Sequence, residues 1–124
     1  MSTLRVNTLQ NAAGTGQPAM SGAAKAWVNF NGTSTVAIRA SFNVTSITDN
    51  GTGDYTVNFT NALEDANYSF LGSGRRNSAT PLIIALSIAN TATYDPSTTT
   101  FRFQTRSDAS GAEDPLAFCV SIFR

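Results

Sequence analysis

The stretch WVNFNGTSTVAIRASFNVTSITDNGTGDYTVNFT (Trp27–Thr60) decides the fold, because apolar and polar residues alternate along most of it. The apolar positions of this repeat are Val36, Ile38, Ala40, Phe42 and Val44 in the middle run, and Tyr55, Val57 and Phe59 in the last run. Alternation with a period of two predicts strands with one buried and one solvated face. The runs are separated by Asn31-Gly32 and Asn50-Gly51, which tolerate the positive φ angles of tight hairpin turns. We therefore predict a β-meander whose register is firmly set, since a one-residue slip would expose the whole apolar set.

The composition extends this prediction to the whole chain. Its 124 residues fit one domain with a real hydrophobic core. Ser, Thr and Asn are abundant, and no window holds the i, i+3, i+4 apolar spacing of a helix. Further strands are predicted over residues 67–71, 82–89, 101–104 and 116–123, with loops over 72–81 and 107–115. We expect an all-β fold, an antiparallel β-sandwich or jelly-roll-like domain of about seven strands.

The chain divides at about residue 25. Residues 1–24 carry one apolar strip (Leu4, Val6 and Leu9) followed by small and polar residues, and we expect an extended N-terminal arm or linker. The strip has three possible roles: adding a strand to a neighbour, docking the arm on a partner, or serving as a flexible tether. Residues 25–124 are expected to form the β-sandwich domain.

Two of the predicted strands, 82–89 and 116–123, are apolar on both faces. A sandwich needs only one apolar face per strand. Small residues on the second face suit a close contact with another subunit. The predicted oligomer interface comprises Ile83, Ala85, Cys119, Ser121 and Phe123. The alternative is that loops of the same chain cover these faces.

Residue types limit the chemistry that this chain offers. It has no histidine and one cysteine, Cys119, so it has no internal disulfide and no His-activated nucleophile. The paired carboxylates Glu64-Asp65 and Glu113-Asp114 are neighbours in turns, which rarely converge on one bond. We expect no enzyme activity, no catalytic residues, no cofactor and no metal. Calcium held by Asp108, Glu113 and Asp114 is the alternative to a solvated acidic loop.

Two loops offer groups for recognition. Arg75 and Arg76 lie in a predicted loop and suit sulfate, phosphate or carboxylate groups of a surface glycan, or else form a solvated turn. Trp27 is read as a core residue or a covering aromatic, with sugar stacking as the alternative. The predicted receptor-binding residues are Arg75, Arg76, Asn77, Asp108, Glu113 and Asp114.

Charge and hydropathy indicate a protein that stays soluble. Eight basic residues balance eight acidic ones, which argues against a nucleic acid or an anionic membrane as partner, because both require clustered Lys and Arg. No apolar run reaches the length of a membrane span, and no signal-peptide pattern follows Met1. We expect synthesis in a cytoplasm and no membrane insertion, unless the protein is carried out on a larger particle.

Two segments resemble a known family. The opening MSTLRVNTLQNAAGTG is similar to that of small virion proteins of tailed bacteriophages, especially marine cyanophages. The block AKAWVNFNGTSTVAIRASFNVTSITDNGTGDYTVNFT resembles the core of phage tail-fibre or fibre-like proteins, and the ending CVSIFR agrees with them. The resemblance implies a virion structural protein, a homotrimer whose N-terminal arm binds other virion proteins. Related proteins carry Asp or a similar polar residue near Ala40, so a site that depends on it is in doubt here.

Two functions follow from these observations. The first is a trimeric, non-catalytic adhesin that binds a host surface glycan or protein through loops 72–80 and 107–115. The second is a purely structural virion component, such as a head fibre, decoration or tail-tip adaptor, that binds only virion proteins. A third, an enzyme acting on host polysaccharide, is not expected.

Overall fold

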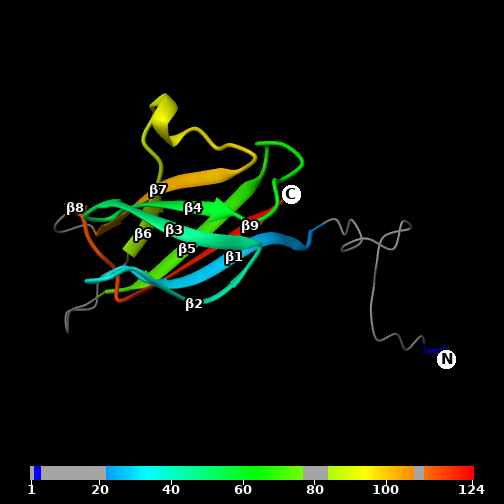
Figure 1. Ribbon diagram of the computed structural model, residues 1–124, viewed down its shortest axis with the longest axis horizontal. Coiled ribbons are helices and arrows are strands. Elements are labelled where there is room, and N and C mark those ends of the chain that lie inside the picture. The colour runs from blue at the N-terminus through cyan, green and yellow to red at the C-terminus, as the bar shows by residue number, and fades with distance from the viewer. Residues whose placement is uncertain (1, 4–21, 77–83, 108–110) are drawn as a thin grey trace.

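The protein is an all-β antiparallel sandwich (Figure 1). The computed structural model describes residues 2–3, 22–76, 84–107 and 111–124. Most of the predicted N-terminal arm therefore lies outside the described residues. The strands are β1 (Ala24–Asn31), β2 (Ala37–Phe42), β3 (Val44–Gly51), β4 (Asp54–Phe59), β5 (Ser69–Arg75), β6 (Ile84–Ser87), β7 (Thr100–Ser107), β8 (Gly111–Ala112) and β9 (Ala117–Phe123). A short 3₁₀ helix, η1 (Ala92–Tyr94), precedes β7.

The strands follow one hydrogen-bonded path that folds over on itself. Its order is β2-β1-β9-β5-β6-β7-β4-β3, and β8 pairs with β7. We call β2, β1, β9 and β5 the first layer, and β6, β7, β4 and β3 the second layer. The pairing of β5 with β6 joins the layers. The inner faces of the two layers enclose one core.

Alternating residues of the four central strands, two in each layer, fill that core. The buried side chains are Ala26, Val28 and Phe30 of β1, Tyr55, Val57 and Phe59 of β4, Phe101 and Phe103 of β7, and Phe118, Val120 and Ile122 of β9. Phe103 bridges the layers, since its ring stacks on Phe118 at 5.6 Å and meets Phe30 edge-on at 6.3 Å. The alternation predicted for Tyr55–Phe59 and for the last strand is confirmed.

The predicted meander is wrong. Asn43 has a φ of 54° and breaks the middle run into β2 and β3, which lie at opposite ends of the strand path. The side-chain NH₂ group of Asn43 donates to the backbone carbonyl oxygens of Lys25 and Asn61. The side-chain oxygen of Asn43 accepts from the backbone amide of Asn61. Asn tolerates the left-handed conformation better than other side chains. The chain therefore forms two hairpins, one in each layer, in place of a single three-stranded sheet.

The buried face predicted for the middle run is also wrong in part. Val44 is buried and Ile38 packs against the core, but Ala40 and Phe42 are exposed, Phe42 by 42%. A β-bulge between Asn29 and Phe30 shifts the pairing of β1 with β2. An extra residue in one strand changes which side chains face inward.

Two loop assignments also change. The β3–β4 turn is centred on Thr52 and Gly53, beyond the predicted Asn50-Gly51, and Gly53 has a φ of 63°. β5 continues to Arg75, within the loop predicted over 72–81. A Cβ atom at Gly74 would lie 2.9 Å from the Ala117 carbonyl oxygen and closer still to the Phe118 ring. Glycine is needed there because β5 lies directly against Phe118.

Candidate interaction surfaces

The outer face of the first layer carries a line of exposed apolar side chains. Backbone register aligns Phe42 with Trp27, Trp27 with Ser121, and Ser121 with Leu71 across the four strands. Trp27 is 38% exposed and Leu71 66%. We call Phe42, Trp27, Ser121 and Leu71 the apolar row. The side chains of Phe42, Trp27 and Leu71 are exposed on the outer face, so the reading of Trp27 as a core residue is wrong.

A second row lies beside the first and is made of small or uncharged residues. Register aligns Ala40, Asn29, Cys119 and Ser73 across the same strands. A shallow hollow between the rows is lined by Leu71, Gly72, Ser73, Cys119 and Ser121. The side-chain oxygen of Asn29 is buried and accepts no hydrogen bond among the described residues. The outer face of the first layer thus combines an apolar row with a row of small or uncharged residues, and its surface is uneven.

The predicted oligomer interface falls partly on this face. Cys119 is exposed, and Ser121 and Phe123 are half-buried on the outer side of β9. The backbone of Ala85 pairs with Ser73 in β5, whereas Ile83 lies outside the described residues. Sequence reasoning missed Phe42, Trp27 and Leu71. Only the register of four strands that are distant in sequence brings them together.

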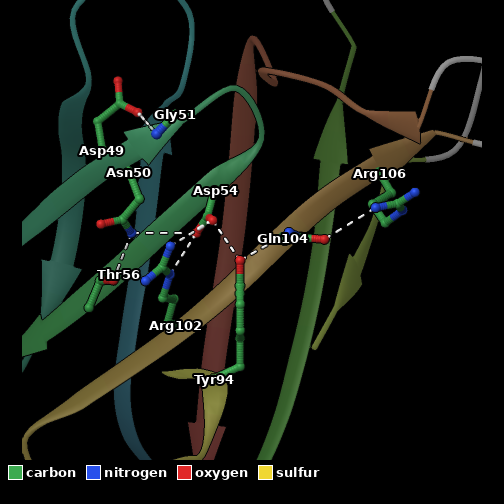
Figure 2. A network of polar contacts seen from close by, with 9 residues as sticks. All are labelled: Asp49, Asn50, Gly51, Asp54, Thr56, Tyr94, Arg102, Gln104 and Arg106. Atoms are coloured by element: carbon green, nitrogen blue, oxygen red, sulfur yellow. Dashed lines mark hydrogen bonds and ion pairs between the residues drawn. The ribbon is translucent and has the colours of Figure 1, made fainter. Parts of the chain in front are cut away.

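The outer face of the second layer is a polar network (Figure 2). Asp54 on β4 receives two hydrogen bonds of 2.9 Å from Arg102 on β7 and one of 2.6 Å from the Tyr94 hydroxyl. The Arg102 guanidinium lies 4.8 Å from the centre of the Tyr94 ring. Gln104 donates to the Tyr94 hydroxyl and accepts from Arg106. Each of these groups therefore has a partner on β4, β7 or η1.

The electrostatics of the network centre on Asp54. Its side chain is 15% exposed and that of Arg102 27%. The hydrogen bonds from Arg102, with a further one from Tyr94, hold the pKa of Asp54 below its ordinary value although partial burial acts the other way. The same ion pair raises the pKa of Arg102. Further along β4, Asn58 donates to Ser46 and Thr48.

Several of the predicted receptor-binding residues are bonded within the domain. Arg76 forms an ion pair of 2.5 Å with Glu113. Asp114 accepts hydrogen bonds of 2.7 Å from the Tyr55 hydroxyl and from the Gly53 amide. Burial and the Asp114 carboxylate raise the pKa of Tyr55. These contacts fix the segment before β9 onto the end of the core.

The remaining residues of that set are more open or lie outside the described part. Arg75 is exposed at the end of β5, and its carbonyl accepts from the Leu116 amide. Asn77 and Asp108 lie outside the described residues, so the alternative of calcium held by Asp108, Glu113 and Asp114 stays a prediction. Among the described residues, His, Cys, Asp and Glu form no group of three or more that could hold a metal ion. The described part also contains no helix of the length and hydropathy needed to cross a membrane.

The described residues thus present two contrasting outer faces, an apolar one on the first layer and a polar one on the second. Comparison of the chain with protein-family models, curated proteins and solved structures finds no match.

Proposed function

We propose that this protein is a non-catalytic bacteriophage virion protein, a fibre-like adhesin that works as a homo-oligomer. The resemblance of the Trp27–Thr60 block to phage fibre proteins motivates the proposal. The observation that carries it is the apolar row, which a single copy leaves open to water. Contiguous exposed apolar surface on a folded domain marks an interaction site.

In this function an oligomer binds its target through several weak sites at once, which raises the overall affinity. The resemblance implies three copies, the N-terminal arm directed to the virion and the β-domain directed outward. Residues 72–80, which include the end of β5, and residues 107–115, which include β8, would contact a host surface glycan or protein. Linked copies raise the effective affinity by about 10²–10⁴ without any new contact.

The second candidate is a purely structural virion component that binds only other virion proteins. A specific observation favours it: Arg76, Glu113 and Asp114 already have partners within the domain. A receptor would have to displace these contacts or use the exposed Arg75.

Binding of the full-length protein to host cells and to a glycan array separates the two candidates. Saturable binding that is lost in an Arg75→Ala variant supports the adhesin. Clean absence of binding by a correctly folded oligomer supports the structural component. Hydrolysis of host polysaccharide, lost in Glu113→Ala or Asp114→Ala variants, would contradict both.

A further inference from the structure

We propose that Asn50 is a site of spontaneous modification, at which the backbone nitrogen of Gly51 attacks the Asn50 side-chain amide and converts it to aspartate or isoaspartate. The chain contains two Asn-Gly pairs, Asn31-Gly32 and Asn50-Gly51, and each is followed by Thr. Glycine leaves the attacking nitrogen unhindered because it has no Cβ. Since the two local sequences are the same, the structure around each pair decides which one reacts. The inference goes beyond the proposed function and does not depend on it.

Asn50 lies near the exposed end of β3, where the pairing with β4 is irregular. Asp49 pairs with Tyr55 and Gly51 with Asp54, so Asn50 is the extra residue of a β-bulge. Asn50 and Gly51 are both exposed, and a Cβ atom at Gly51 would meet nothing within 4 Å. The backbone therefore has room to adjust while the cyclic imide forms.

Figure 2 shows the side chains around the reacting atoms. The Gly51 amide donates a hydrogen bond of 3.0 Å to the Asp49 carboxylate, which is an acceptor for the proton that the attacking nitrogen loses. The Asn50 Nδ2 donates to the Thr56 hydroxyl at 2.9 Å and to the Asp54 carboxylate at 3.4 Å. Rotation of the Asn50 side chain toward Gly51 breaks these two contacts. Both are exposed, so water can replace the lost partners.

The Asn31-Gly32 pair is held in place by its surroundings. The Asn31 Nδ2 donates to the Thr33 carbonyl oxygen at 2.9 Å, and the Asn31 Oδ1 accepts from the Thr33 hydroxyl at 2.8 Å. The Gly32 amide donates to the Pro115 carbonyl oxygen at 2.9 Å. Gly32 is buried, and a Cβ atom there would lie 2.6 Å from the Pro115 side chain. Ring closure at this pair would break these bonds in packed surroundings, so Asn31 serves as an internal control.

The reaction needs no co-reactant other than water. The Gly51 nitrogen forms a bond to the Asn50 Cγ while the bond from Cγ to Nδ2 breaks. The Gly51 amide proton is transferred, by way of Asp49 or water, to the departing Nδ2, which leaves as ammonia. Water then opens the cyclic imide. Cleavage between the nitrogen and Cγ gives aspartate, whereas cleavage at the main-chain carbonyl carbon gives isoaspartate and adds one carbon to the backbone of β3.

The product carries a negative charge at the edge of the polar network. The chain has a formal net charge of zero, so one conversion makes it more acidic by one charge. A carboxylate has no proton to donate, so the hydrogen bonds from Asn50 to Thr56 and Asp54 are lost. The new charge also repels the Asp54 carboxylate. We therefore expect the modified protein to have a less stable second layer than the fresh protein.

The experiment follows the full-length protein during incubation at neutral pH. Trypsin cleavage after Lys25, Arg39 and Arg75 places the two pairs in different peptides, residues 26–39 and 40–75. We expect fragmentation mass spectrometry to find aspartate and isoaspartate at Asn50 accumulating at least about tenfold faster than at Asn31. Isoelectric focusing should show a more acidic form appearing at the same rate. In protein unfolded by urea the two rates should converge, because the local sequences are the same.

Three variants test the contacts that control the reaction. Thr56→Val removes an acceptor of the Asn50 amide and should accelerate conversion at Asn50 about two- to tenfold, with Asn31 unchanged. Asp49→Ala removes the acceptor of the Gly51 amide proton and should slow it. Asn50→Gln is the matched control, because its longer side chain closes a larger and less favourable ring. This variant should form no acidic species, and its unfolding midpoint should stay constant on ageing while that of the native protein falls.

The contrary outcomes are equally specific. Equal rates at Asn50 and Asn31 in the folded protein would overturn the proposal. So would conversion of Asn50 in urea but not in the folded protein, because the contacts with Thr56 and Asp54 would then protect it. An unchanged rate in the Thr56→Val variant would overturn the control of the reaction by that hydrogen bond. These outcomes leave the proposed virion function untouched, since the binding experiments test it separately.

Discussion

The outer face of the first layer presents aromatic and aliphatic side chains in register, whereas that of the second layer presents an ion pair and its hydrogen-bonded neighbours. The inner faces of both layers are alike, with alternating Phe, Tyr, Val and Ile in the core. The outer faces differ because the polar groups of the second layer have hydrogen-bond partners, whereas the apolar side chains of the first layer are exposed to water. Asp54, Arg102 and Tyr94 satisfy one another, so the second layer stabilises the monomer. Trp27, Phe42 and Leu71 are exposed in the monomer, so they can gain free energy by association.

The largest expected effect comes from separating β5 from β9, which would disrupt the apolar row itself. Gly74→Ala places a methyl group against the Phe118 ring and the Ala117 carbonyl. We expect a loss of about 3 kcal/mol in the free energy of unfolding, at the upper end for overpacking. Urea unfolding followed by circular dichroism measures it. Ser73→Ala, at the neighbouring exposed position, should change it by less than about 0.5 kcal/mol; equal losses in both variants would contradict the close packing of Gly74.

Residues of the polar outer face should contribute more to the stability of the monomer than residues of the apolar outer face. Asp54→Ala should lower the free energy of unfolding by about 2 kcal/mol, because Arg102 and Tyr94 lose their acceptor. Leu71→Thr should change the monomer by less than about 0.5 kcal/mol, since its side chain is mostly exposed. Chemical unfolding at a concentration at which the chain is monomeric checks both. A larger loss for Leu71→Thr would mean that the first-layer face also stabilises the monomer.

Replacing Arg102 by Lys tests the geometry of the polar face. Lysine keeps the charge but loses the two-pronged contact with Asp54 and weakens the stacking on Tyr94. We expect a loss of about 1 kcal/mol. An unchanged unfolding midpoint in the Arg102→Lys variant would show that charge alone holds the network.

The smallest effect is a pH dependence confined to the second layer. The pKa of Asp54 is lowered in the folded protein, so its stabilisation is present above its unfolded pKa and is lost as pH falls through the folded value. The difference in unfolding free energy between the native protein and Asp54→Asn should therefore be constant near neutral pH and shrink below about pH 4. A constant difference down to pH 2 would indicate that ionisation of Asp54 contributes nothing.

Much of the fold could be predicted from the sequence. Residues 55–59, 101–103 and 116–123 alternate regularly, and these strands build the core as expected. The errors have local physical causes: the positive φ of Asn43 splits one strand, the bulge beside Asn29 turns Phe42 outward, and β5 extends through its glycines. The alternation of apolar and polar residues within one segment does not show where the strand breaks or bulges. The break at Asn43 is held by contacts with Lys25 and Asn61, and the bulge depends on how β1 pairs with β2.

The all-β class, the two-faced strands and the small residues on the outer side of the last strand follow from the residue pattern alone. The row formed by residues 42, 27, 121 and 71, and the contacts of Asp54 with Arg102 and Tyr94, arise only when the strands pair in three dimensions. Side-chain periodicity is a property of one strand, whereas the neighbours of an outer-face residue are set by strand order and register. Those are fixed when distant segments pair around a common core.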